Sequence, residues 1–67
     1  MSVMKVIEIM ASSDKSWEDA TKKGLKKAAQ SVKNIRSAWV QDQSVTVDKD
    51  GDVKEFRVTL KVTFEVQ

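Results

Sequence analysis

The sequence predicts an α+β domain in which a three-stranded antiparallel sheet wraps around one helix, in the order β-α-β-β. Residues 56–66 alternate apolar and polar side chains without interruption, as in a strand with one buried and one exposed face. Residues 17–34 instead repeat small and aliphatic side chains every three and four positions, as in a helix with one apolar side. Because one helix cannot cover both faces of such a sheet, neighbouring copies of the chain are expected to cover the rest.

The first strand is expected at residues 3–10, where β-branched side chains predominate. Both faces of this segment carry apolar side chains, so both are expected to be covered. Lys5 and Glu8 interrupt the apolar stretch, which argues against the continuous core of a signal peptide. Residues 11–15 form a polar break that is expected to end the strand.

A helix is expected over about residues 17–34. Ser16 is placed to cap it, because its hydroxyl can accept from the free N–H groups of the first turn, and Glu18 and Asp19 favour the positive end of the helix dipole. The helix is expected to lie close to the sheet, with Gly24 at a point of close approach. Its apolar side is formed by small and aliphatic residues, namely Ala20, Gly24, Leu25, Ala28, Ala29, Val32 and Ile35.

The second strand is expected at residues 37–47 and a turn at residues 48–52, before the third strand. The length of the turn decides which side chains of the second strand face the helix. A two-residue turn, Asp50-Gly51, would bury two glutamines, and an unpaired buried amide is costly. In that register the apolar face would hold Trp39, Gln41, Gln43, Val58, Leu60 and Val62.

We favour a three-residue loop from Lys49 to Gly51, with Gly51 in the left-handed region and a bulge. This loop shifts the pairing by one residue, so that Ala38 and Val40 join the apolar face. A large aromatic side chain on the face that the helix leaves open is expected to contact a second subunit or a flat ligand. That open face would carry Trp39, Gln41, Gln43, Arg57, Thr59 and Lys61.

Composition limits the chain to a single domain, residues 1–67. A chain this short buries only about 60% of its unfolded surface and is marginally stable alone. It has no Cys and no His, which excludes disulfides and the usual zinc ligands. Oligomerisation is the remaining way to stabilise such a small scaffold, and we expect it.

The same composition argues against several functions. Without His, Cys or a visible nucleophile–base pair, no enzymatic site is predicted. No segment approaches the roughly 20 apolar residues of a membrane span, and a net charge of +2 is too small to indicate nucleic-acid binding by itself. We therefore expect a cytoplasmic protein that binds neither membranes nor nucleic acid and is not an enzyme.

Three other features have a structural interpretation and a functional alternative. Trp17 is expected to have a structural role, lying over the sheet or over a subunit interface with its N–H group on a carbonyl. The alternating aspartates of residues 48–52 have no Glu at the distance that a calcium loop requires, so a turn is favoured, although an oligomer could still gather carboxylates around a divalent ion. A basic stripe on the helix is expected to be solvated, or else to attract phosphate groups; it comprises Lys22, Lys23, Lys26, Lys27 and Lys33.

Several segments, taken in order along the chain, resemble the dodecin family. They are KVIEI at residues 5–9 with its small-residue turn, SWEDA at residues 16–20, NIR at residues 34–36, and VTLKV at residues 58–62 with Phe64. The resemblance covers essentially the whole chain and implies a β-α-β-β subunit in a hollow shell of twelve copies. It also implies non-enzymatic binding of flavins in pairs, at subunit interfaces on two-fold axes, for storage or sequestration.

The resemblance implies a site that departs from the family pattern. Ser37 stands where the family carries its flavin-stacking Trp, and Trp39 follows two residues later on the same side of the strand. Arg57 stands where the family has a glutamine that hydrogen-bonds the flavin ring. Asp42 matches an acidic position associated with the ribityl chain, and Gln43 matches a common family glutamine.

These five residues are expected to line an interface pocket for FMN or a related flavin or nucleotide. Loss of a stacking contact of ~1–3 kcal/mol would weaken binding about ten- to a hundredfold, unless Trp39 restores the contact. The alternative is a structural or interaction oligomer of the same fold with weak or no flavin binding, in which Trp39 packs against its symmetry mate. A third hypothesis is an anion-binding surface on the basic stripe of the helix.

Overall fold

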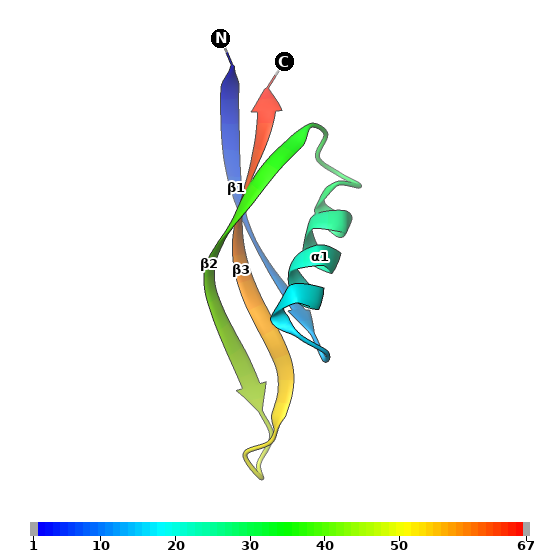
Figure 1. The fold of residues 1–67 in the computed structure, drawn as a ribbon, viewed down its shortest axis with the longest axis vertical. Coiled ribbons are helices and arrows are strands. Elements are labelled where there is room, and N and C mark those ends of the chain that lie inside the picture. The colour runs from blue at the N-terminus through cyan, green and yellow to red at the C-terminus, as the bar shows by residue number, and fades with distance from the viewer. Residues whose placement is uncertain (1, 67) are drawn as a thin grey trace.

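A computed structural model describes residues 2–66 as a three-stranded sheet with a helix packed across one of its faces (Figure 1). The elements follow in the order β1 (Val3–Ser13), α1 (Trp17–Ala28), β2 (Ile35–Val47) and β3 (Val53–Val66). Strand β3 lies between β1 and β2 and is antiparallel to both. The β-α-β-β order and the antiparallel sheet predicted from the sequence are confirmed.

The core lies between α1 and the middle of β3. Val58, Leu60 and Val62 on β3 and Ala20 on α1 are each at most 1% exposed. These β3 residues are the apolar half of the alternating pattern, so the predicted helix-facing side of this strand is confirmed. The partly buried side chains that pack around them are Ile7, Ile9, Ala11, Trp17, Leu25, Ile35 and Ala38.

Gly24 is the point at which α1 comes closest to β1. A Cβ atom at this position would lie 2.8 Å from the Cβ atom of Ala11, which is closer than two non-bonded carbon atoms can approach. The missing side chain therefore allows the close approach of helix and sheet that the small residues of the helix predicted.

Strand β1 is longer than expected, because residues 11–13 stay paired with β3 instead of forming part of a polar break. Its two faces differ in a single copy. Ile7 and Ile9 pack on the core, whereas Val6 and Met10, on the other face, are 57% and 66% exposed. One copy of the chain thus covers only one face of β1.

Helix α1 is shorter than expected and ends at Ala28. Beyond it, the N–H groups of Gln30 and Ser31 donate to carbonyls three residues back, which is the tighter geometry of a 3₁₀ turn. Asn34 has a φ of 64°, a left-handed conformation that Asn tolerates better than most residues, and its carbonyl accepts the N–H of Glu65 at 3.0 Å. The chain must reverse here so that β2 can pair with β3, and this tertiary requirement overrides the helical pattern.

The hairpin between β2 and β3 contains the predicted three-residue loop. The N–H of Asp48 donates to the carbonyl of Asp52 at 2.9 Å, and the N–H of Gly51 donates to the carbonyl of Asp48 at 3.0 Å. Gly51 has a φ of +85°, so it is left-handed as predicted. The Oδ1 atom of Asp48 accepts from the N–H groups of Asp50 and Asp52 at 2.9 and 3.0 Å, which confirms the interpretation of this segment as a hairpin turn.

Of the three irregularities in the pairing of β2 with β3, the two nearer the turn shift the register by one residue and then restore it, and the third lies at the start of β2. Lys54, near the turn, and Gln41, in the middle of β2, are the extra residues at the two irregularities. Trp39 therefore pairs with Lys61 and Ala38 with Val62, as the favoured loop predicts. The stretch between the two bulges is displaced by one residue relative to that prediction.

This displacement makes the expected faces of Gln41 and Gln43 wrong. Gln41 is the extra residue of a bulge, and Gln43 pairs with Val58 on the helix-facing side. Asp42, which strict alternation would turn toward the helix, pairs instead with Thr59 on the open face. Asp42 therefore lies on the open face, where alternation had placed Gln41 and Gln43.

The bulge at Gln41 has a packing reason. It turns Val45 to the helix-facing side, opposite Phe56, and the ring of Phe56 meets that of Trp17 edge to face, with 5.1 Å between their centroids. Strict alternation would have pointed Val45 toward the open face. Gln43 is exposed in its new position, so no amide is buried by the shift.

Candidate functional site

The sheet face that α1 leaves open carries most of the predicted site residues. Cross-strand pairing arranges its side chains in rows, and neighbours within a row stand ~4.5–5.5 Å apart. Apolar, hydroxyl and charged groups therefore alternate along one continuous surface. Written from β1 through β3 to β2, the rows are Val6–Thr63–Ser37, Glu8–Lys61–Trp39, Met10–Thr59–Asp42 and Ser12–Arg57–Ser44.

Trp39 is the central feature of this open face. Its side chain is 69% exposed, and Met10, in the next row, is 66% exposed. Lys61 lies beside Trp39 in the same row, followed by Glu8. An indole with this exposure offers its flat surface to a partner, and large apolar side chains gathered on a sheet face are typical of a contact site.

Ser37 and Asp42 lie on either side of the Trp39 row. The hydroxyl of Thr63 donates to the carbonyl of Ser37 at 3.2 Å, which leaves the hydroxyl of Ser37 to donate to that of Thr63. Asp42 is exposed, and within residues 2–66 its carboxylate forms no ion pair. A small hydroxyl and an available carboxylate thus flank the indole.

Arg57 lies at the far end of the open face, roughly 13 Å along the strand from the Trp39 row. Its Nη2 atom is 3.3 Å from Oε1 of Glu55, and both side chains are substantially exposed. An exposed ion pair of this kind contributes little to stability, about 0–1 kcal/mol. The remaining guanidinium N–H groups are therefore available to an anionic ligand.

The structure brings together Ser37, Trp39, Asp42 and Arg57 on one face of one copy, and places Gln43 on the other face. The sequence analysis missed Met10 as a neighbour of this group. Its position follows from the pairing of β1 with β3, and no turn joins those two strands. The one sequence feature that indicates the face of Met10 is the alternation of side chains along β1, which places it opposite to Ile9.

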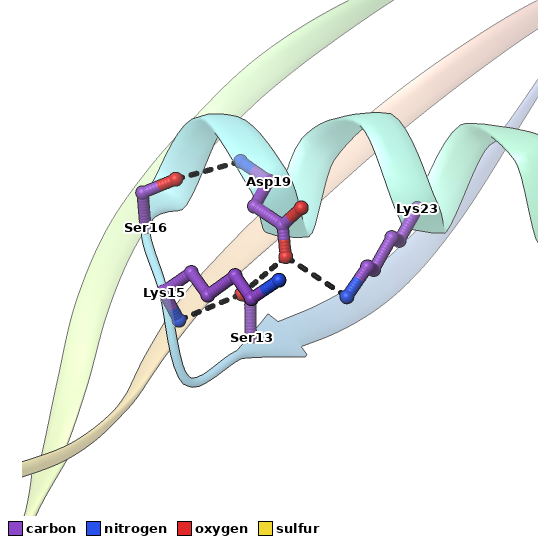
Figure 2. Close-up of polar contacts among 5 residues, drawn as sticks. All are labelled: Ser13, Lys15, Ser16, Asp19 and Lys23. Carbon is purple, nitrogen blue, oxygen red and sulfur yellow. Dashed lines mark hydrogen bonds and ion pairs between the residues drawn. The ribbon is translucent and has the colours of Figure 1, made fainter.

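A second polar cluster lies at the start of α1 (Figure 2). The hydroxyl of Ser13 donates to Oδ2 of Asp19, and Nζ of Lys23 lies 3.1 Å from the same oxygen. The N–H of Lys15 donates to Oγ of Ser13, and the N–H of Asp19 donates to Oγ of Ser16, both at 2.9 Å. Ser16 is therefore the N-cap, as predicted, and the cluster fastens the end of β1 to the first turn of α1.

The same contacts lower the pKa of the Asp19 carboxyl below its ordinary value of 3.8. The hydrogen bond from Ser13 is the largest cause, followed by the hydrogen bond from Lys23, because both favour the charged carboxylate. These contacts join the end of β1 to the first turn of α1, so the cluster is a structural clasp.

Trp17 connects the first turn of α1 to strands β2 and β3. Its Nε1–H donates to the carbonyl of Ser44 at 3.0 Å, and its ring packs on Phe56. The predicted structural position of Trp17, with its N–H on a carbonyl, is confirmed. This leaves Trp39 as the indole that is free for a partner.

Two further observations limit the chemistry of one copy. In the part of the chain that the structure describes, no group of three or more His, Cys, Asp or Glu side chains is placed to hold a metal ion. No helix among those residues has both the length and the apolar character needed to cross a membrane.

The fold and the open face define the class: a small α+β protein with β-α-β-β order, whose sheet is covered by its own helix on one side only. The chain belongs to the dodecin family, whose sequence model matches residues 3–67. This confirms the resemblance on which the candidate site was built. Dodecins are small binding proteins that assemble into oligomers.

Curated and solved relatives agree with this assignment. The calcium dodecin of Mycobacterium tuberculosis is 40% identical over 67 residues, which cover 100% of this chain and 93% of that protein. A crystal structure of an M. tuberculosis calcium dodecin, described as having a calcium-binding site, matches with a TM-score of 0.85 and 39% identity over 98% of this chain and 93% of that one. A variant of the T. thermophilus dodecin matches with a TM-score of 0.91 and 27% identity over 100% and 98%.

Proposed function

We propose that this dodecin binds a flat, conjugated ligand of the flavin class, FMN or a related flavin, and stores or sequesters it without turnover. The observation that carries the proposal is Trp39, which is 69% exposed in the middle of the open face. Stacking of an aromatic side chain on a heterocycle is worth ~1–3 kcal/mol per base in nucleic-acid binders. An indole in this position supplies that contact although Ser37 occupies the family's usual stacking position.

The proposed ligand lies between copies, in a shell of twelve. One face of the heterocycle meets Trp39, and its other face needs a second surface. A two-fold axis would supply the same open face from a second copy. Met10 and Val6, which are 66% and 57% exposed on this face, would then be covered as well, so ligand binding and subunit contact support each other.

Each side chain of the open face has a role in this proposal. Ser37 leaves room for the ring to shift along β2 toward Trp39, by roughly 6–7 Å. Asp42 accepts hydrogen bonds from the hydroxyls of the ribityl chain, and Arg57 meets a phosphate or the face of a second ring. Gln43 lies on the opposite face and is not part of the site within one copy.

A fluorescence titration tests the proposal. Added protein should quench FMN fluorescence with a stoichiometric end point, and Trp39→Ala should weaken binding about ten- to a hundredfold. Trp17→Phe is the matched control, because it keeps an aromatic ring on Phe56 and does not touch the open face. FMN fluorescence that stays unchanged at micromolar protein would contradict flavin binding and favour an oligomer with a structural role.

A second titration separates the ring from the phosphate. If Arg57 meets the phosphate, Arg57→Gln should lower the affinity for FMN more than the affinity for riboflavin, which has no phosphate. An equal loss for both flavins would place Arg57 against the ring system instead.

Calcium binding is a second candidate function, because a relative 40% identical over the whole chain is a calcium dodecin. One copy has no group of three or more carboxylates within residues 2–66, so the ion would need acids from more than one copy. Equilibrium dialysis against calcium should then saturate at fewer than one ion per chain. The absence of saturable binding, together with a thermal midpoint that EDTA does not change, would exclude this candidate.

A further inference from the structure

The β2–β3 hairpin continues past the other elements as a two-stranded arm, residues 46–55 (Figure 1). β1 ends at Ser13, opposite Phe56, so the arm is paired only with itself. A ribbon of two strands is marginally stable in water on its own. Val47 and Val53 pair with each other on the arm and are 55% and 50% exposed, and Val45, where the arm begins, lies on the same face and is 40% exposed. The arm thus presents an apolar surface that this copy does not cover.

A groove of about 500 Å³ runs between α1 and β1, which is an edge strand of the sheet. Lys23 and Lys27 contribute to its lining. The rest of the lining is mostly small or apolar and comprises Ile7, Ile9, Met10, Ala11, Ser12, Gly24, Ala28, Ser31 and Val32. The groove therefore combines an apolar surface with two positive charges.

The arm and the groove carry opposite charges. The tip of the arm bears three aspartates, and Asp48 uses one carboxylate oxygen within the turn. The carboxylates of Asp50 and Asp52 form no hydrogen bond or ion pair inside residues 2–66. In the groove, Lys23 is paired with Asp19, whereas the ammonium group of Lys27 has no ion-pair partner among the described residues.

The arm of one copy does not reach the groove of the same copy. It extends beyond the end of the molecule where α1 begins (Figure 1), whereas the groove is lined by residues 23–32, from the second half of α1 onward. An apolar, acidic arm and an apolar, basic groove that lie apart in one chain are complementary between two chains.

We propose that the arm of one copy docks in the α1–β1 groove of another, with its valines on the apolar lining and Asp50 or Asp52 near Lys27. The two surfaces differ, so the contact is either head-to-tail around a closed ring of copies or exchanged reciprocally between two copies about a two-fold axis. The inference rests on the self-association proposed above but not on any ligand. The arm contact leaves Trp39 itself free, whereas Met10 and Ser12 both line the groove and stand on the open face, so the two contacts meet along β1.

Charge reversal tests the contact. Lys27→Glu and Asp52→Lys should each lower the mass measured by light scattering. The two changes together in one chain should restore the mass, because the groove and the arm would again carry opposite charges, with their signs exchanged. Lys26→Glu is the matched control, since it makes the same change on the same helix outside the groove. An unchanged mass for both single variants, or a double variant that does not recover, would overturn the proposal.

Engineered cysteines provide a second, independent test, because the chain has no Cys of its own. A chain carrying both Ser31→Cys in the groove and Val47→Cys on the arm should form linked multimers on oxidation, whereas each single variant should stay unlinked. Pairing Val47→Cys with Lys26→Cys instead should give little linkage. Linked dimers of the single Val47→Cys variant, or no multimers from the first pair, would refute the docking.

The two proposals can fail separately in this test. Trp39→Ala, added to the Ser31→Cys/Val47→Cys chain, should weaken FMN quenching and leave the cross-linked multimers unchanged. Multimers that persist without any flavin binding would contradict the proposed function alone, and flavin binding without multimers would contradict the docking alone.

Discussion

Gly24 shows how one missing side chain sets the distance between helix and sheet. A methyl group at this position would lie 2.8 Å from the Cβ atom of Ala11, and that atom is fixed to the backbone of β1. Neither atom can move away by a change of rotamer, so α1 or β1 itself would have to shift.

Gly24→Ala is therefore expected to destabilise the protein, although Ala is the better helix former. The gain in helix propensity is about 1 kcal/mol, whereas overpacking a tight contact costs about 1–3 kcal/mol. We expect a net loss of up to about 2 kcal/mol, measured as a lower thermal midpoint at fixed protein concentration. Adding Ala11→Gly should recover part of the loss, because it removes the atom in conflict, and a higher midpoint for Gly24→Ala alone would disprove the steric argument.

The spacing of Ser37 and Trp39 along β2 places the two side chains in neighbouring rows of the open face. Two residues of displacement move an aromatic side chain by one row but keep it on the same side of β2, because side chains in a strand alternate. The position of the indole along the strand therefore decides which row of the open face carries the aromatic ring.

At the scale of elements, the clasp between β1 and α1 makes stability depend on pH. Asp19 has a lowered pKa in the folded chain because Ser13 and Lys23 bond to its carboxylate. A carboxyl with a lowered pKa stabilises the fold above its ordinary value and loses that contribution as the pH falls through the folded value. The contribution of Asp19 is thus present above pH 3.8 and disappears below it.

Asp19→Asn should accordingly lower the thermal midpoint at neutral pH, because the amide cannot replace the charged acceptor. The difference from the unmodified chain should shrink as the pH falls below 3.8 and through the lowered pKa. Glu18→Gln is the control, since Glu18 forms an exposed pair with Lys22 and should change the midpoint much less. A difference that is constant with pH would show that the clasp acts through packing and not through charge.

The bulges in the β2–β3 hairpin determine which side chains of β2 lie on each face of the sheet. They leave Trp39 opposite Lys61, where the loop length predicts it, while they exchange the faces of Asp42 and Gln43. The shift puts an acid in the row next to that of the exposed indole and places Val45 on the helix-facing side, opposite Phe56. The bulge at Gln41 therefore changes both the side chains that face the helix and the side chains on the open face.

For the whole molecule, the shape indicates that one copy is incomplete. Its principal extents are 52 × 19 × 14 Å and its radius of gyration is 13.7 Å, compared with about 11 Å for a compact chain of this length. The fully buried apolar side chains are confined to Ala20, Val58, Leu60 and Val62 among the described residues. A core this small in so extended a chain leaves most of the apolar surface to be covered by other copies.

The thermal midpoint should consequently rise with protein concentration, because a partner that binds only the folded chain stabilises it by mass action. The measurement is a dilution series followed by circular dichroism, with light scattering to report the mass at each concentration. A well-folded monomer at the lowest concentration, with a midpoint independent of dilution, would contradict the shell and both proposed interfaces.

The candidate site could be predicted only in part from the sequence. The open face of β3 followed from alternation, and Trp39 followed from the loop that sets the register. The neighbours contributed by β1, such as Met10 and Glu8, could not be predicted, since no turn joins β1 to β3 and the register of distant strands depends on how the helix crosses the sheet.

The sequence by itself determined the order of elements, the cap at Ser16, the left-handed Gly51 and the helix-facing side of β3. These features depend on periodicity and turn chemistry, which act over a few neighbouring residues. The tertiary structure alone decided the end of α1 and the faces of Asp42 and Gln43. The chain had to reverse before β2, and Val45 had to pack against Phe56, and such requirements arise only when distant segments come into contact.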